Sequence, residues 1–134
     1  HDIYKVPSLE CGTMRYVEMD ELLARADIIS LHIPSLPGQP IVNAETIGKM
    51  KDGVIIINTS RGTNIDEAAL LEALESGKVY GAGLDVYAEE PSKNAALYSD
   101  PRVSCTPHIG AATEEAQSRI GAEVVALIVQ QFSL

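Results

Sequence analysis

The chain has 134 residues, of which 46% are hydrophobic and only 4% aromatic, so it can form one domain with a mainly aliphatic core. Its formal charge of −9 provides no basic surface for phosphates, and we expect no nucleic-acid partner. The two cysteines, Cys11 and Cys105, match no metal or redox spacing, and we expect free thiols in a reducing cytoplasm. No apolar run approaches the roughly 20 residues of a membrane span, so no membrane association is expected.

The N-terminal half alternates short β-branched runs with amphipathic segments. In order, the predicted elements are a weak strand at 14–17, a short helix at 20–25, a buried strand at 28–33, a helix at 43–50 and a strand at 54–58. Pro34 ends the second strand because proline lacks a backbone donor, and Asn43 is placed to cap the second helix. The run VIIIN at 54–58 is the clearest strand of the chain.

The C-terminal half continues the alternation. Its predicted elements are a helix at 66–76 capped by Asp66, strands at 79–84 and 103–105 separated by a loop with Pro91, and a last helix capped by Thr113. The last helix carries an apolar stripe at helical spacing that includes Ile120, Val124 and Leu127. Strands that alternate with helices, without long hairpins, indicate an α/β fold with a parallel sheet.

The C-terminal ends of four predicted strands carry residues suited to a site. They are His32 and Pro34, the segment 58–61, Asp85 and the segment 106–108. In open parallel sheets, ligands bind beyond the C-terminal ends of the strands. We therefore expect these residues to converge on one site.

Arg61 and His108 are the side chains best suited to chemistry. A guanidinium on a rigid strand end suits bidentate capture of a small carboxylate, and a histidine can move a proton near neutral pH. A carboxylate beside His108 would orient it, and we expect Glu90 in that place. Judged singly, each of the three residues has a simpler interpretation. Arg61 would be a surface arginine paired with an acid, Glu90 part of a solvated acidic loop, and His108 a histidine that caps a helix or packs against its neighbours.

Other candidates are weaker. His32 lies between two apolar residues and is interpreted as structural, although its place at a strand end would let it border a cofactor. No histidines and carboxylates have metal-ligand spacing, so no metal site is expected. Ser60 lacks a GxSxG context, which argues against a serine hydrolase.

Three sequence blocks, taken together, resemble a known family. They are IINTSRG at 56–62 with DEAAL at 66–70, GAGLDVYAEEP at 81–91, and CTPHIGAAT at 105–113. In this order they resemble the D-2-hydroxyacid dehydrogenases, the family of phosphoglycerate dehydrogenase and its relatives. The resemblance extends over nearly the whole chain.

The resemblance implies a set of catalytic roles. Arg61 would bind the carboxylate and 2-oxo oxygen of the substrate. His108 would protonate the developing alkoxide during reduction and act as the base in the reverse direction. Glu90 would hold His108 charged and aligned, and Asp85 would hydrogen-bond the nicotinamide carboxamide.

The resemblance also implies NAD as the cofactor. Asp2 would hold the adenosine ribose hydroxyls and so select NAD over NADP; judged alone, it is a flexible terminal aspartate. Pro34 and Thr59 would line the adenine and nicotinamide sides, and His32 and Gly110 would border the cofactor. NAD carries the redox chemistry, whereas the protein supplies position and charge.

One family element is missing from the 134 residues: they contain no GxGxxG loop for the pyrophosphate. The expected fold is therefore a partial Rossmann-like doubly wound parallel sheet without its first βα unit. Residues 1–134 are expected to be the C-terminal portion of an NAD-binding domain, a fragment without the substrate domain. We expect residues 1–18 to lie away from the sheet, and the isolated chain to bind NAD weakly and to be inactive.

The sequence thus predicts an oxidoreductase whose whole protein transfers a hydride between NAD(H) and a small D-2-hydroxy or 2-oxo acid. The identity of the acid stays open. The alternative is a non-catalytic, NAD-sensing member of the same fold, like some transcriptional corepressors. Relatives often dimerise through this domain, so a homodimer is expected.

Overall fold

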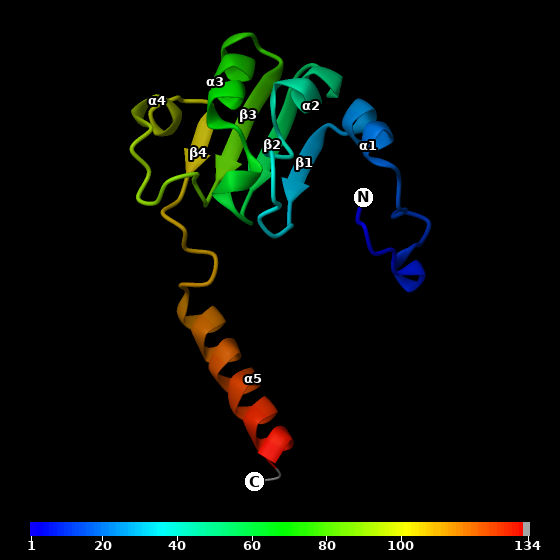
Figure 1. Ribbon diagram of the computed structural model, residues 1–134, viewed down its shortest axis with the longest axis vertical. Coiled ribbons are helices and arrows are strands. Elements are labelled where there is room, and N and C mark those ends of the chain that lie inside the picture. The colour runs from blue at the N-terminus through cyan, green and yellow to red at the C-terminus, as the bar shows by residue number, and fades with distance from the viewer. Residues whose placement is uncertain (133–134) are drawn as a thin grey trace.

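The computed structural model describes residues 1–132, whose strands form one parallel four-stranded sheet (Figure 1). In spatial order the strands are β1 (Ile28–Leu31), β2 (Val54–Asn58), β3 (Val79–Leu84) and β4 (Val103–Cys105). The pairing places Leu31 beside Asn58, Asn58 beside Leu84, and Leu84 beside Cys105. The C-terminal ends of all four strands therefore meet at one edge, as predicted for the α/β fold.

The helices are α1 (Met19–Arg25), α2 (Ala44–Lys49), α3 (Glu67–Glu75), α4 (Ala95–Tyr98) and α5 (Glu114–Phe132), with short 3-10 helices η1 (Pro7–Leu9) and η2 (Gly62–Asn64). Of these, α2, α3 and α4 connect successive strands, whereas α1 precedes β1 and α5 follows β4. The predicted caps are confirmed. The Asn43 side chain accepts the backbone N–H of Thr46 at the start of α2, and the Asp66 side chain accepts the N–H groups of Ala68 and Ala69 at the start of α3.

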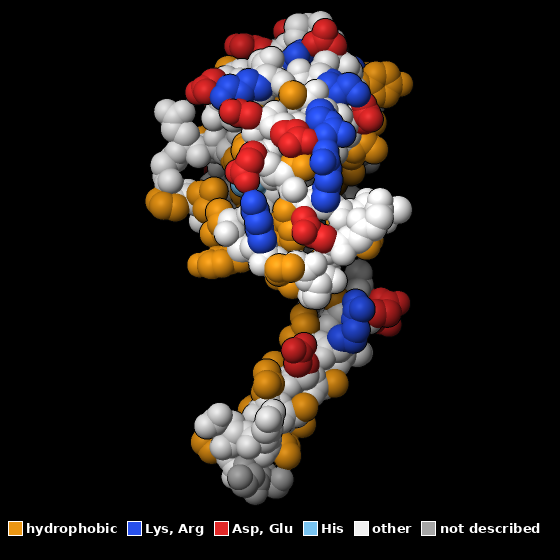
Figure 2. All heavy atoms as spheres, turned by 90° about the vertical axis from the view of Figure 1, so that its right-hand side faces the viewer, with side chains coloured by type: hydrophobic (Ala, Val, Ile, Leu, Met, Phe, Trp, Pro, Cys, Tyr) orange, Lys and Arg blue, Asp and Glu red, His pale blue; other side chains and the backbone are white. Residues whose placement is uncertain are grey.

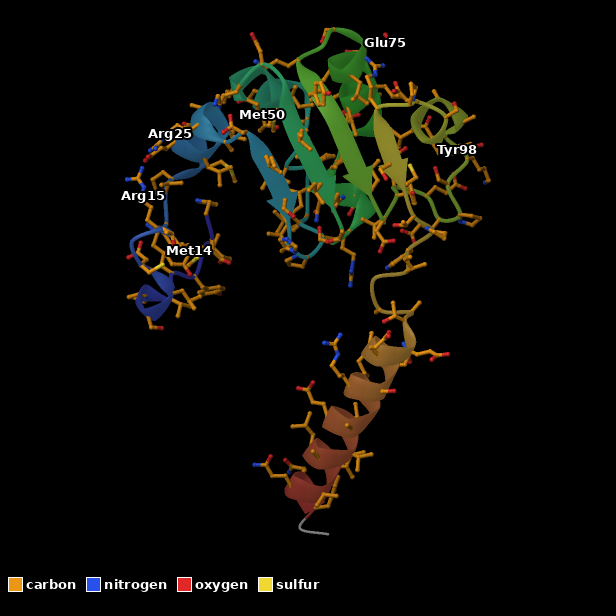
Figure 3. All side chains as sticks on the ribbon, turned by 180° about the vertical axis from the view of Figure 1, so that it is seen from behind. Met14, Arg15, Arg25, Met50, Glu75 and Tyr98 are labelled. Carbon is orange, nitrogen blue, oxygen red and sulfur yellow. The ribbon has the colours of Figure 1, made fainter. Side chains whose placement is uncertain are left out.

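The core lies between the sheet and the helices α1 to α4. Along β2, Val54 and Ile56 are buried and point toward these helices, whereas the alternate residues Ile55 and Ile57 are half-buried. The first four helices contact one another in chain order, so they cover the same face of the sheet. Figure 3, drawn from behind, looks onto the opposite face of the sheet. Along β1, Ile28 alternates with the buried Ile29 and Leu31 and is 58% exposed.

The prediction of a weak strand at 14–17 is wrong. Residues 1–18 lie beside the sheet and not in it, and their strand-like pairing is limited to an isolated antiparallel bridge between Cys11 and Met14 (Figure 1). A β-prone run forms a strand only when a neighbouring strand accepts its backbone hydrogen bonds, and here no described strand lies next to it.

One further element differs from the sequence prediction. The short helix α4 was expected to be loop; it begins because the Asn94 side chain accepts the backbone N–H of Leu97 at 3.3 Å. The predicted last helix forms as α5, but none of its described residues is buried, and Figure 2 shows apolar side chains exposed along it. Among the described helices, none is long and apolar enough to cross a membrane.

Candidate active site

The segment after β2 is shaped by a buried amide. Asn58 alternates in phase with Val54 and Ile56 and is fully buried. Its Oδ1 accepts the backbone N–H of Ser60 at 3.0 Å and the Ser60 hydroxyl at 2.8 Å, and its Nδ2 donates to the carbonyl of Arg61 at 2.9 Å. These bonds bend the chain directly after the strand, which fixes where the backbone of Arg61 lies.

A second buried amide, Asn64, joins this turn to the end of β1. Its Nδ2 donates to the Ser60 hydroxyl and to the carbonyl of Ile33, each at 3.1 Å. The Arg61 side chain itself is exposed, and its Nη1 donates to the Ser60 carbonyl at 2.6 Å. Within residues 1–132 no acid forms an ion pair with Arg61, so its guanidinium is available to an anion from outside.

Asp85, directly after β3, fastens the loop that carries His108. Its Oδ1 accepts the Thr106 hydroxyl at 2.5 Å and the N–H of Ile109 at 2.8 Å, and its Oδ2 accepts the N–H of Gly110 at 2.9 Å. Burial alone would raise the pKa of the Asp85 carboxyl, but these hydrogen bonds outweigh burial and lower the pKa. The carboxylate thus stays ionised and binds the loop on both sides of His108 through these hydrogen bonds.

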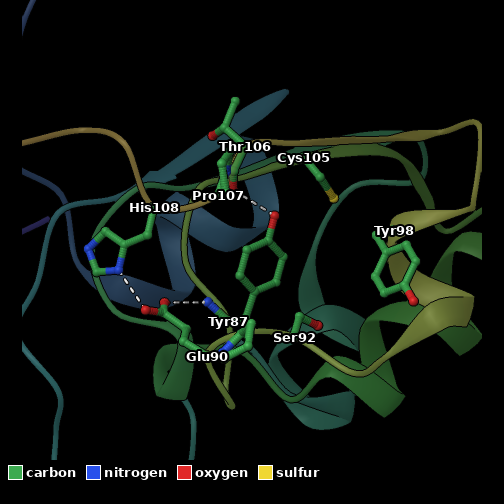
Figure 4. A pocket seen from close by; sticks show the side chains of 9 residues that line it. Tyr87, Glu90, Ser92, Tyr98, Cys105, Thr106, Pro107 and His108 are labelled. Atoms are coloured by element: carbon green, nitrogen blue, oxygen red, sulfur yellow. Dashed lines mark hydrogen bonds and ion pairs between the residues drawn. The ribbon is translucent and has the colours of Figure 1, made fainter. Parts of the chain in front are cut away.

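Glu90 and His108 lie side by side (Figure 4). The Nδ1 atom of His108 is 2.7 Å from Oε2 of Glu90, and Oε1 of Glu90 accepts the backbone N–H of Tyr87 at 3.1 Å. The hydrogen bond with His108, followed by the one from Tyr87, lowers the pKa of the Glu90 carboxyl. His108 has a φ of 58°, a left-handed conformation that is uncommon for residues other than glycine.

Tyr87 connects the two loops. Its hydroxyl donates to the carbonyl of Thr106 at 2.8 Å, and the carbonyl of Leu84, at 3.2 Å from the same oxygen, can share that proton. Burial raises the pKa of this hydroxyl, and the neighbouring Cys105 thiol adds to the shift. Tyr87 therefore remains a neutral donor that holds the histidine loop against the end of β3.

Two cavities share the Glu90–His108 pair as a wall. One, of about 270 Å³, also contacts Arg61, so the three residues expected to carry the chemistry line a single cavity. The other has a volume of about 540 Å³, and its lining also includes Tyr87, Tyr98 and Pro107 (Figure 4). The structure thus places the Arg61 guanidinium at the same cavity as the Glu90–His108 carboxylate–imidazole pair.

Of the residues expected to bind the cofactor, several lie at the C-terminal ends of the strands and Asp2 does not. His32, Pro34 and Thr59 are exposed after β1 and β2 at the same edge, and the Ser30 hydroxyl is 2.8 Å from Nε2 of His32. Asp2 lies outside the sheet, where its carboxylate accepts the N–H of Tyr4 at 2.8 Å. The structure therefore does not join Asp2 to the strand ends.

The strand ends present exposed polar side chains beside a close backbone contact. A Cβ on Gly110 would lie 3.1 Å from Oδ2 of Asp85, so the backbone approaches that carboxylate closely. Thr59 offers an exposed hydroxyl and His32 an exposed imidazole, which suit polar groups of a nucleotide. In the structure, Asp85 binds the histidine loop.

Reasoning from sequence placed Asn58 and Ser60 at the site within the segment 58–61 but did not assign the buried role of Asn58, and it missed Gly62, Asn64 and Tyr87. For Asn58 a sign was present, because a polar residue in phase with Val54 and Ile56 must face the core. For the others the decisive partners are distant in sequence.

The family model for the D-isomer specific 2-hydroxyacid dehydrogenase NAD binding domain matches residues 1–110. A hydroxypyruvate reductase of Thermotoga maritima is 50% identical over 125 residues, which cover 90% of this chain and 41% of that protein. A D-3-phosphoglycerate dehydrogenase of Mycobacterium tuberculosis is 48% identical over 109 residues, 81% of this chain and 21% of that protein.

Among solved structures, a D-isomer specific 2-hydroxyacid dehydrogenase of Lactobacillus delbrueckii ssp. bulgaricus in its NAD complexed form superposes with a TM-score of 0.73. It is 32% identical, and the match covers 81% of this chain and 37% of that chain. The chain thus spans well under half the length of these relatives.

Proposed function

The chain belongs to the D-isomer-specific 2-hydroxyacid dehydrogenases, through their NAD-binding domain, and on that premise we propose that the whole protein transfers a hydride between NAD(H) and a small 2-oxo or D-2-hydroxy acid. The observation that supports this most directly is the cavity that Arg61, Glu90 and His108 line together, with Glu90 and His108 joined at 2.7 Å. Carboxylate capture and proton transfer are the two tasks that the protein must perform for such a substrate.

Arg61 binds the substrate in this proposal. Its guanidinium forms paired hydrogen bonds to the carboxylate and directs one donor toward the 2-oxo oxygen. The buried amides of Asn58 and Asn64 fix the backbone that carries it. The substrate carbon is thereby held at the cavity that His108 borders.

His108 transfers the proton. Because Nδ1 faces Glu90, Nε2 is the atom left to meet the substrate. In reduction Nε2 gives its proton to the 2-oxo oxygen as that oxygen gains negative charge, and in oxidation Nε2 removes the hydroxyl proton. The nicotinamide, when bound, supplies or accepts the hydride. The Glu90 carboxylate stabilises the charged imidazole and fixes its orientation.

For the cofactor, we propose that His32, Pro34 and Thr59 border NAD at the strand ends, together with Gly110. Asp85 is proposed to contact the carboxamide while it keeps the histidine loop in place. Asp2 is proposed to select NAD over NADP, which requires the N-terminal segment to lie at the adenosine ribose in the whole protein.

We also propose that residues 1–134 are the C-terminal portion of the NAD-binding domain, that the whole protein is a homodimer, and that the chain alone turns over no substrate. The 134 residues contain no glycine-rich pyrophosphate loop. Without this loop, the isolated chain should bind NAD weakly or not at all. Calorimetry with NAD and the isolated chain tests this expectation, and a micromolar dissociation constant would contradict it.

The function itself is tested with the purified whole protein, NADH and a panel of acids that includes glyoxylate, pyruvate and hydroxypyruvate. Consumption of NADH with at least one acid is expected. Arg61→Lys should raise the KM for that acid by about a hundredfold, because the paired hydrogen bonds are lost. Arg25→Lys is the matched control, since Arg25 pairs with Glu21 on α1, away from the cavity. NAD binding without turnover of any acid would instead support a non-catalytic, NAD-sensing role.

A further inference from the structure

The loop that carries Glu90 is fastened by a carboxylate that lies outside it. Glu67 is the first residue of α3. Its Oε1 accepts the backbone N–H of Ala88, and its Oε2 accepts the side-chain amide of Asn94, both at 2.9 Å. Ala88 comes shortly before Glu90 and Asn94 shortly after it, so one side chain ties down both ends of the segment that carries Glu90.

The chemistry of both contacts requires a carboxylate at position 67. The Oδ1 atom of Asn94 is already used, because it accepts the N–H of Leu97 as the cap of α4. Only the Nδ2 donor of Asn94 can therefore face Glu67. Two acceptor oxygens meet two donors, and the place of Glu67 in the first turn of α3 favours its negative charge.

Packing does not hold Glu90 in place. The side chain of Glu90 is 36% exposed and that of His108 is 47% exposed. Glu90 can meet His108 only if its backbone is held by other contacts. Glu90 itself binds the N–H of Tyr87 and the imidazole of His108, and the Asn94 side chain accepts the N–H of Leu97 at the start of α4. Within the part of the chain that the structure describes, the other side-chain hydrogen bonds that reach residues 88–94 from outside come from Glu67.

We propose that Glu67 is a positioning residue for the proton-transfer pair: it holds the backbone of residues 88–94 so that Glu90 meets His108. This inference rests on the proposed function, because it assigns Glu90 and His108 to proton transfer. Glu67 contacts neither residue directly and acts through the loop.

The kinetic test uses Glu67→Gln in the whole protein. Glutamine keeps the size of the side chain but replaces one acceptor oxygen with an NH2 group. That group cannot accept a hydrogen bond from either Ala88 or Asn94, so one of the two contacts is lost. The kcat for reduction of the 2-oxo acid should fall about tenfold, because misplacing Glu90 removes only part of the contribution of general acid–base catalysis. The KM for NADH should stay unchanged. Glu89→Gln is the matched control: Glu89 lies in the same loop, and its ion pair with Lys93 is exposed. Its kcat should stay within about twofold of the wild type.

A double-mutant cycle separates positioning from general damage. If Glu67 acts through Glu90, the variant with both Glu67→Gln and Glu90→Gln should be no slower than Glu90→Gln alone, because two residues of one network are not additive. Fully additive losses would overturn the proposal.

An NMR titration of the Glu90 carboxyl tests the positioning role of Glu67 without measuring enzyme activity. In Glu67→Gln the pKa of Glu90 should rise from its lowered value toward the ordinary glutamate range, and in Glu89→Gln it should stay lowered. If Glu67→Gln does not fold, Asn94→Ser keeps an oxygen that can accept the N–H of Leu97, removes the amide donor to Glu67 and adds no charge, and the same rise is expected. An unchanged titration of Glu90 overturns the inference, whereas a wild-type protein that reduces no acid overturns only the proposed function.

Discussion

Gly62 lies directly against the backbone of Tyr87: a Cβ added to Gly62 would stand 1.8 Å from the Tyr87 carbonyl oxygen and 2.6 Å from the Ala88 nitrogen. The turn that carries Arg61 and the loop that carries Glu90 are therefore in backbone contact. Because neither backbone can move aside without breaking hydrogen bonds of its own, this contact sets the spacing between Arg61 and the Glu90–His108 pair.

Gly62→Ala should therefore be strongly destabilising. The added methyl meets backbone atoms, which cannot rotate away as a side chain would, and the free energy of unfolding should fall by about 3 kcal/mol. Urea denaturation measures the change. Gly48→Ala is the control, because a Cβ there meets no atom within 4 Å and Gly48 lies inside α2. That variant should be more stable by about 0.5 to 1 kcal/mol. Equal stability of the two variants would contradict the backbone contact.

Asn58→Ala should weaken the turn from inside. The substitution leaves the N–H and hydroxyl of Ser60 and the carbonyl of Arg61 without their partner in a buried setting. One unsatisfied buried group costs about 1 to 3 kcal/mol, so the free energy of unfolding should fall by at least about 2 kcal/mol.

The KM of the whole protein for the 2-oxo acid should also rise in Asn58→Ala, since Arg61 loses its support. Thr59→Ala changes the exposed neighbour and should alter the free energy of unfolding by less than about 0.5 kcal/mol. A loss of the same size in both variants would show that the Asn58 amide does not support the turn.

Local signals made the helix starts predictable. Each cap needs only a side-chain oxygen and an N–H two or three residues later, and both lie in the same stretch of sequence at Asn43 and Asp66. The strand at 54–58 is equally local. The prediction at 14–17 failed because a strand depends on a partner, and a β-prone run does not reveal whether one is present.

The site was predictable only in part, for a similar reason. Strand ends and parallel topology together bring the segments of Arg61 and His108 to one edge, which the order of elements indicates. The contact between Gly62 and Tyr87 and the bond from Asn64 to Ile33 join segments far apart in the chain. Neither contact follows from spacing or composition.

Glu90→Gln should change the pH dependence of reduction. The hydrogen bond with His108 lowers the pKa of Glu90, so the carboxylate persists to lower pH than an ordinary glutamate. Its contribution is fully present above the ordinary carboxyl pKa and is lost as the pH falls through the lowered value. The wild-type kcat/KM should therefore decline on the acid side only below the ordinary range.

In Glu90→Gln no carboxyl remains to be protonated at this position. The acid-side decline should disappear from the profile, and the plateau should lie about a hundredfold lower. A profile of kcat/KM against pH, with circular dichroism at each pH to verify folding, measures both effects. Glu89→Gln should keep the wild-type profile, and an unchanged acid limb in Glu90→Gln would assign that limb to another group.

Asp85→Asn should loosen the histidine loop in a pH-dependent way. Asp85 is only 6% exposed, and its carboxylate accepts bonds from Thr106, Ile109 and Gly110. Asparagine keeps one acceptor oxygen but turns an amide donor toward the N–H of Gly110. The free energy of unfolding at neutral pH should fall by about 1 to 3 kcal/mol, the usual effect of an unsatisfied buried donor.

The sign of the pH effect follows from the lowered pKa of Asp85. Its stabilisation is present above the ordinary aspartate pKa and is lost as the pH falls through the lowered folded value, so wild type and variant should converge in acid. Urea denaturation across this range measures the convergence, and faster amide exchange at Gly110 in the variant locates the change. Asp52→Asn, whose side chain is 90% exposed beside Lys78, is the control and should leave stability nearly unchanged. A difference between wild type and Asp85→Asn that stays constant with pH would mean that the charge of Asp85 does not hold the loop around His108.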